Sequence, residues 1–108
     1  MTVKELKDKL SLKEHCLPDS DREVKDGYAG DLLSWVMGRA EPDSAWLTIM
    51  SNANVCAVAV LADLACIILT EGVSPDPELL SRCTAQGINL LSTEESTYRT
   101  AARLSQLL

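Results

Sequence analysis

The stretch from residue 46 to residue 72 limits the possible folds of this chain more than any other part. A short apolar run ends at the polar residues 51–54, an Ala- and Val-rich run follows, and after Asp63 a second short β-rich run ends at Glu71-Gly72. This order predicts a strand, a polar turn, a buried helix and a second strand, which together make one right-handed βαβ unit. We therefore expect an α/β fold with a mainly parallel sheet and helices on both faces.

The rest of the chain continues the alternation of helices and strands, and we expect residues 1–108 to form a single domain. The patterns predict helices over residues 2–10, 32–39, 55–62, 77–86 and from 92 onward, strands over residues 13–17, 45–50, 64–69 and 88–91, and an extended segment over residues 22–28. Local signals predict the helix ends: capping boxes at Thr2–Glu5 and Ser92–Glu95, caps at Asp31 and Asp76, Pro77 as a first helical residue, and Gly87 as a terminator.

The net charge and the short apolar runs argue against nucleic acid and membranes as partners. The formal net charge is −6, and an acidic surface repels phosphate backbones, so we expect no binding to nucleic acid. The longest apolar run, residues 53–69, is short and is interrupted by Asp63. A membrane-spanning helix needs about 20 apolar residues, so no membrane segment is expected.

The cysteines favour a reducing compartment and give no sign of a metal site. The four cysteines are Cys16, Cys56, Cys66 and Cys83, none of them in a CxxC pair, and His15 is the only histidine. A zinc site needs closer spacing or more histidines. Cysteines within apolar runs behave as small hydrophobic residues. We therefore predict free thiols, a cytoplasmic location, and no metal or cofactor.

A series of short motifs resembles the DRTGG domain family over residues 10–104. In chain order they are Asp21-Arg22-Glu-Val, Gly27-Tyr28, Gly30-Asp31-Leu-Leu-Ser34, Trp46-Leu-Thr48, Asn54, Ala57-Val-Ala-Val-Leu61, Ile67-Ile68, Gly72, Pro75, Gly87-Ile88 and Leu91-Ser-Thr93. The resemblance implies a small α/β domain similar to the N-terminal domain of HPr kinase/phosphorylase. Such domains also occur beside CBS modules and within some phosphotransacetylases, and they are usually regulatory. The chain departs from the family pattern at Ser51-Asn52, where a Thr-His pair is expected, and at Asp26-Gly27, where paired glycines are expected.

The polar turn Ser51, Asn52 and Asn54 is the candidate binding site. It follows a predicted strand and begins a predicted helix, and in open α/β sheets ligands bind outside the carboxyl ends of the strands. A helix N-terminus at that edge favours an anion, so we predict a small anionic or nucleotide-like ligand. Asp31 and Ser34 are expected on the rim of the same site, and Arg22 is a candidate counter-charge. The alternative is that Ser51, Asn52 and Asn54 only cap the helix.

The sequence carries no pattern for catalysis. It contains neither GxxxxGK[ST] nor GxGxxG, so resemblance to a domain of a kinase does not make the chain a kinase. His15 stands between Glu14 and Cys16 with no nucleophile pattern around it. We therefore predict a protein without enzymatic activity.

Two apolar helices suggest how the chain assembles. The helix over residues 55–62 is apolar on all sides, and the helix over residues 32–39 is expected to bury Leu33, Val36, Met37 and Ala40, with Trp35 near the edge. A second copy would cover the outer face of the first helix, and a charge at Val58 or Ala59 is expected to disrupt the dimer or the fold. The alternative is that neighbouring helices and the termini bury that face.

The sequence is compatible with two functions. The first is a regulatory or sensor domain that works as a homodimer. The second is an accessory protein that binds a larger metabolic enzyme through its acidic surface and takes no small-molecule ligand.

Overall fold

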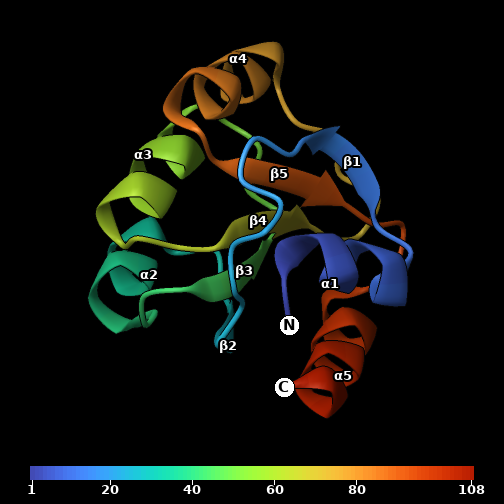
Figure 1. Ribbon diagram of the computed structural model, residues 1–108. Helices are drawn as coiled ribbons and strands as arrows, with labels where there is room; N and C mark the ends of the chain where they lie inside the picture. Colours follow the sequence, from blue (N-terminus) through green and yellow to red (C-terminus); the bar gives the residue numbers. More distant parts are fainter.

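A computed structural model describes all residues, 1–108, as a five-stranded sheet with helices on both faces (Figure 1). In chain order the elements are α1 (Val3–Leu10), β1 (Lys13–Cys16), β2 (Asp26–Ala29), α2 (Leu33–Arg39), β3 (Ser44–Thr48), α3 (Asn54–Leu61), β4 (Cys66–Leu69), α4 (Pro77–Gln86), β5 (Asn89–Ser92) and α5 (Thr97–Leu107). The strand order is β1-β5-β4-β3-β2. Strands β2 to β5 are mutually parallel and only β1 is antiparallel, which confirms the predicted fold class.

The predicted βαβ unit lies at the centre of the sheet. Strands β3 and β4 pair in parallel with Trp46 opposite Ile67, and every residue of both strands is buried. Continuous apolar strands of this kind are typical of a parallel sheet that is covered on both faces. The indole Nε1 of Trp46 is fully buried and donates to the carbonyl of Gly30 at 2.8 Å. This bond ties the end of β2 to the neighbouring strand β3.

The sheet separates two apolar cores. Helices α2, α3 and α4 cover one face, around Trp46, Val58, Leu79 and other buried side chains. Helices α1 and α5 cover the other face, and both termini lie on that side (Figure 1). The described helices are all too short or too polar to cross a bilayer.

Most predicted helix ends are confirmed, because they depend on neighbouring residues alone. Thr2 and Glu5 form a complete capping box at the start of α1. Pro77 is the first residue of α4, and Gly87 ends the helix in the left-handed conformation with φ 74°. A glycine adopts this conformation without the steric cost that a Cβ brings.

Two predicted caps are wrong, and a third is right in position only. Asp76 occupies the N-cap position of α4, but its side chain makes no capping bond and instead accepts from the Ser51 hydroxyl. Asp31 does not cap α2, because its carboxylate instead accepts hydrogen bonds from the Thr48 hydroxyl and the Ile49 amide at the end of β3. The predicted capping box at residues 92–95 does not form either. Ser92 is the last residue of β5, and Ser96 caps α5 by accepting from the Arg99 amide.

The apolar faces of α2 and α3 also differ from the prediction. Met37 is exposed, and Val36 is the only fully buried residue of α2, because this short helix packs mainly against α3. In α3, Val58 and Ala59 are buried in the core rather than on the outer face. The exposed apolar side chains of the two helices are Leu32, Trp35, Met37, Ala57, Val60 and Leu61; we call them the α2–α3 apolar surface.

Candidate functional site

The carboxyl ends of β2, β3, β4 and β5 meet at one edge of the sheet, as parallel strands require. The predicted site residues follow β2 and β3 at this edge. Asp31 comes after β2 and is held against the end of β3 by its bonds from Thr48 Oγ1 at 2.8 Å and Ile49 N at 3.0 Å. The structure thus brings Asp31 to the strand that leads into the Ser51–Asn54 turn.

The Ser51–Asn54 turn is held by hydrogen bonds of its own. The Asn52 side-chain oxygen accepts from the Asn54 amide at 2.9 Å, which stabilises the start of α3. The Ser51 hydroxyl donates to Asp76 Oδ1 at 3.1 Å, and the Asp76 amide donates back to the Ser51 carbonyl. Asn52 thus stabilises the turn before α3, although the N-cap residue is Ala53, which makes no side-chain capping bond, and Asn54 is the first residue of the helix.

Several donors at this turn make no hydrogen bond within the protein. They are the side-chain NH₂ groups of Asn52 and Asn54. The Ser34 hydroxyl is likewise unpaired, but it lies in the first turn of α2, after β2. Asn54 and Ser34 are exposed. Carboxylates lie at the same edge, since Asp31 follows β2 and Asp76 contacts Ser51. The edge can therefore donate hydrogen bonds, but Asp31 and Asp76 disfavour a highly charged anion.

Arg22 lies at the opposite edge of the sheet, so its predicted role as counter-charge is wrong. Its guanidinium bridges the turns that lead into β3 and β4, at 2.9 Å from Asp43 Oδ1 and 2.8 Å from Asp63 Oδ1. It also donates to the Asp63 carbonyl at 2.7 Å. Hydrogen bonds from Arg22 and then from Lys25 lower the pKa of Asp43. Arg22 therefore stabilises the edge of the sheet where the parallel strands begin, which we call the amino edge.

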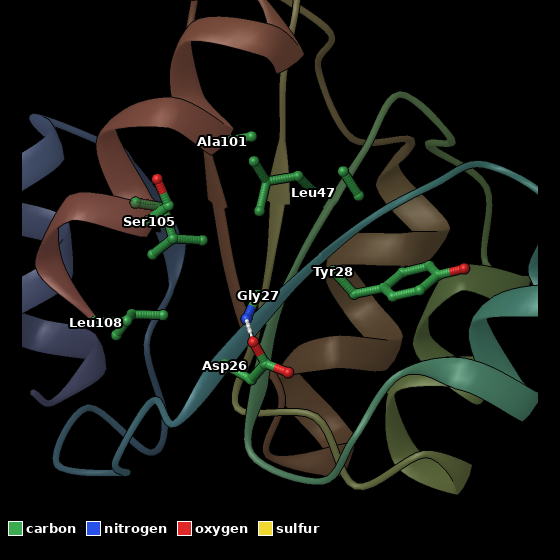
Figure 2. Close-up of a pocket in the computed structure, with 9 residues that line it drawn as sticks. Asp26, Gly27, Tyr28, Leu47, Ala101, Ser105 and Leu108 are labelled. Atoms are coloured by element: carbon green, nitrogen blue, oxygen red, sulfur yellow. Dashed lines mark hydrogen bonds between the residues drawn. The ribbon is translucent and has the colours of Figure 1, made fainter.

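A groove of about 390 Å³ runs between the edge strand β2 and helix α5 (Figure 2). Six of its nine lining residues are hydrophobic, and the α5 side consists of Ala101, Leu104, Ser105 and Leu108. Gly27 forms part of the strand side, and its amide donates to the carboxylate of Asp26 at 2.8 Å. A Cβ on Gly27 would lie only 2.8 Å from Leu104 Cδ2. The Leu104 side chain therefore has to shift if residue 27 carries a Cβ.

The structure reveals a side-chain pair that the sequence analysis missed. The His15 ring nitrogen Nε2 lies 2.7 Å from Ser92 Oγ. The pairing of β1 with β5 shifts register between Glu14 and Cys16, which leaves His15 as the extra residue of a β-bulge. Burial, and after it the positive charge of Lys13, lower the pKa of His15, so the ring is neutral at pH 7. The two residues lie far apart in the sequence, and no local pattern marks them.

The cysteines are free, as predicted. Cys56, Cys66 and Cys83 are buried and Cys16 is half-buried. Burial raises the pKa of Cys66 to about 12 and also raises the pKa of Cys83. The thiols of Cys66 and Cys83 thus remain protonated at neutral pH and pack as small apolar groups. No group of three or more His, Cys, Asp or Glu residues is arranged to hold a metal ion.

Comparison with known proteins identifies the family. The DRTGG domain matches residues 32–107, most of the chain, and the protein belongs to this family. Among solved structures, it is similar to the CBS and DRTGG domains of the regulatory region of Clostridium perfringens pyrophosphatase, a structure complexed with the activator diadenosine tetraphosphate. The TM-score is 0.79 at 14% identity, over 99% of this chain and 47% of that one, so this chain spans about half of that regulatory region. No curated protein matches the sequence.

Proposed function

We propose that this chain is a regulatory domain without catalytic activity, which works as a homodimer and binds a small anionic or nucleotide-like ligand at the carboxyl edge of its sheet. The observation that carries the proposal is the group of free donors at that edge, on a domain of the DRTGG family. The side-chain NH₂ groups of Asn52 and Asn54 and the hydroxyl of Ser34 make no internal hydrogen bond. The regulatory setting of the similar pyrophosphatase domain supports the same function.

The carboxylates at this edge limit the ligand. Asp31 already accepts two hydrogen bonds from the end of β3, and Asp76 accepts one from Ser51. Their negative charges disfavour a ligand with several charges unless a cation accompanies it. Ser51, Asn52, Asn54, Asp31 and Ser34 would then orient the ligand by hydrogen bonds rather than by ion pairs.

A thermal-shift screen tests the ligand. The wild-type protein is heated with adenine nucleotides, phosphorylated sugars and inorganic anions, and the screen is repeated with an Asn52→Ala/Asn54→Ala variant. A ligand present at 100 times its dissociation constant adds about 2.7 kcal/mol to stability. We expect a shift in the wild type that is smaller in the variant. If the variant shifts equally, these residues only stabilise the turn. The same purified protein is expected to show no ATPase, kinase or phosphatase turnover.

The α2–α3 apolar surface supports the homodimer. Leu61 is 72% exposed and Trp35 is 52% exposed, with the Arg39 guanidinium stacked 3.7 Å above the Trp35 ring. Exposed apolar groups on neighbouring helices are typical of protein contacts, and a two-fold dimer is the commonest way to cover them. Because Leu61 is already exposed, Leu61→Glu is expected to leave the fold intact and to give a monomer. Tyr98→Glu, at an 83% exposed residue of α5 on the other layer, is the control.

A second candidate is an accessory protein that binds a larger metabolic enzyme. The sequence favours its acidic surface for this contact, whereas the exposed side chains favour the α2–α3 apolar surface. Light scattering of the wild type at micromolar concentration separates the two candidates. A dimer that Leu61→Glu converts to a monomer supports the first. A monomeric wild type that captures one enzyme in stoichiometric amounts, and loses it with Leu61→Glu, supports the second.

A further inference from the structure

An apolar groove lies beside the open edge of the sheet at β2. Strand β2 is the last in the order β1-β5-β4-β3-β2, so one of its sides has no neighbouring strand. Helix α5 lies over β2 and β3, and the groove of about 390 Å³ runs between α5 and β2 along this edge (Figure 2). We call it the β2–α5 groove. It shares no residue with the Ser51–Asn54 turn or with the α2–α3 apolar surface.

The backbone of β2 has unpaired hydrogen-bonding groups at this edge. In a parallel pair, alternate residues of a strand turn their N–H and C=O groups toward the neighbouring strand, and the residues between them turn theirs away. The Gly30 amide donates to the Leu47 carbonyl at 3.1 Å, which sets the alternation. Gly27 and Ala29 therefore turn their backbone groups toward the open edge. Of these groups, the Gly27 amide is bonded to the Asp26 carboxylate, and the others have no partner.

The groove has room for side chains of an added strand. Gly27 and Ala29 face α5, because their partners in β3 belong to the core on that side, whereas Tyr28 points to the opposite face (Figure 2). Residues directly opposite each other on neighbouring strands point to the same face of a sheet. Side chains opposite Gly27 and Ala29 on an added strand would thus enter the groove, where the lining is mainly apolar.

The charge at the groove limits the occupant. Asp26 is the only charged residue that lines it and is exposed, while the neighbouring Lys25 pairs with Asp43 at 3.2 Å. The Asp26 carboxylate covers the Gly27 amide, and charged side chains commonly protect open strand edges in this way. A lysine or arginine on an incoming segment would attract the carboxylate and free that amide. A second copy of this chain would instead bring another Asp26 and a formal net charge of −6 to the same edge.

From this arrangement we infer that the β2–α5 groove binds an extended peptide segment of a partner protein, which adds to the sheet as a further strand beside β2. The segment has apolar side chains at alternate positions, which enter the groove, and a lysine or arginine next to Asp26. In this mode of recognition the backbone hydrogen bonds give affinity and the alternate side chains give specificity. The inference is independent of the ligand site at the carboxyl edge.

Selection of peptides from a phage-displayed library of random heptapeptides tests the inference. The purified wild-type protein is the target, and the most enriched peptide is synthesised. Its affinity for the wild type and for variants is measured by isothermal titration calorimetry, and circular dichroism checks that each variant is folded. We expect an enriched pattern of apolar residues at alternate positions with a lysine or arginine at one end.

Three variants and one control locate the bound peptide. Ala29→Pro removes an outward N–H at a place where an edge strand accepts proline, and the loss of that hydrogen bond should weaken binding about tenfold. Ser105→Phe fills the groove and should also weaken binding, whereas Ala102→Phe, at an exposed residue of α5 outside the groove, should bind as the wild type does. Asp26→Asn removes only the charge. It should weaken the selected peptide more than the same peptide with glutamine in place of its basic residue.

The inference is wrong if no alternating apolar pattern is enriched, or if Ala29→Pro and Ser105→Phe bind the selected peptide as the wild type does. A wild-type dimer that Ala29→Pro converts to a monomer, and that Leu61→Glu leaves intact, would show that a second copy occupies this edge and would also overturn the inference. The thermal-shift screen of the carboxyl edge has no bearing on these outcomes, so the two proposals fail separately.

Discussion

The Arg22 guanidinium connects the two turns that lead into the central strands, and its removal tests the description of the amino edge. Asp43, with φ 65°, precedes β3, and Asp63, with φ 56°, precedes β4. Both are non-glycine residues in the left-handed region, which has a steric cost. Arg22 makes hydrogen bonds to both carboxylates and to the Asp63 carbonyl. The proposed perturbation is Arg22→Met, which keeps much of the side-chain length and removes these donors.

The expected loss follows from the exposure of each partner. Asp43 is 27% exposed and Asp63 is 70% exposed. A partly buried charged hydrogen bond contributes about 1.5 kcal/mol and a bond to a carbonyl about 1 kcal/mol, whereas an exposed ion pair contributes well under 1 kcal/mol. Arg22→Met should therefore lower the free energy of unfolding by about 2–3 kcal/mol at pH 7. That loss corresponds to a fall in melting temperature of about 10 °C for a domain of this size.

Two further variants test whether the loss of stability comes from the hydrogen bonds of Arg22. Arg22→Lys keeps the charge but not the planar fork, so it should lose about half as much stability as Arg22→Met. Asp63→Gly relieves the left-handed backbone and removes only the exposed carboxylate, so it should change stability little. Both are measured by urea denaturation monitored by circular dichroism.

The stability that the Arg22–Asp43 pair contributes is expected to fall in acid. Because Arg22 lowers the pKa of Asp43 in the folded state, the ionised carboxylate stabilises the fold above the pKa of an unfolded aspartate, about 3.9. That stability is lost as the pH falls through the lower folded value. The difference between wild type and Arg22→Met should stay constant from pH 5 to pH 7 and shrink below about pH 4. A difference under about 0.5 kcal/mol at pH 7, or one that does not shrink in acid, would refute the reasoning.

Three further changes test the packing. Gly27→Ala should cost about 1–3 kcal/mol by overpacking, because its Cβ would contact buried Leu104; urea denaturation measures the loss, and an unchanged midpoint would contradict the close approach of α5. Asn89→Leu should cost about 3 kcal/mol, because the buried amide exchanges two bonds with the Asp19 backbone and donates to the Ala65 carbonyl; thermal denaturation measures it, and near-wild-type stability would refute it. Ser96→Ala should cost about 1 kcal/mol, with faster amide exchange in the first turn of α5, and unchanged exchange there would exclude the cap.

The central βαβ unit was predictable from sequence because its signals are local. The buried strands β3 and β4 are short continuous apolar runs, which are typical of strands in a sheet that is covered on both faces. Thr2, Pro77 and Gly87 act on backbone groups within a few residues, so their roles at helix ends were also readable in advance. The bond from the Asn54 amide to the Asn52 side chain is equally local, since it spans only two residues.

The predictions that were wrong concern side chains whose hydrogen-bond partners are distant in the sequence. Asp31 looked like a helix cap, but the end of β3 supplies two better donors that only the paired strands bring near. Arg22 looked like a ligand counter-charge, but it meets Asp63, 41 positions away, at the other edge of the sheet. The edge of the sheet at which the Arg22 side chain lies depends on the order of the strands, and hydrophobic patterning does not encode that order.

The sequence by itself determined the α/β class, the parallel core and most helix ends, since apolar periodicity and turn chemistry operate over a few residues. The tertiary structure alone decided which polar groups meet. His15 and Ser92 are 77 positions apart and lie 2.7 Å from each other only because β1 pairs antiparallel with β5 and bulges at His15. A strand pairing between the two ends of a chain depends on the packing of the whole sheet, and no short segment carries that information.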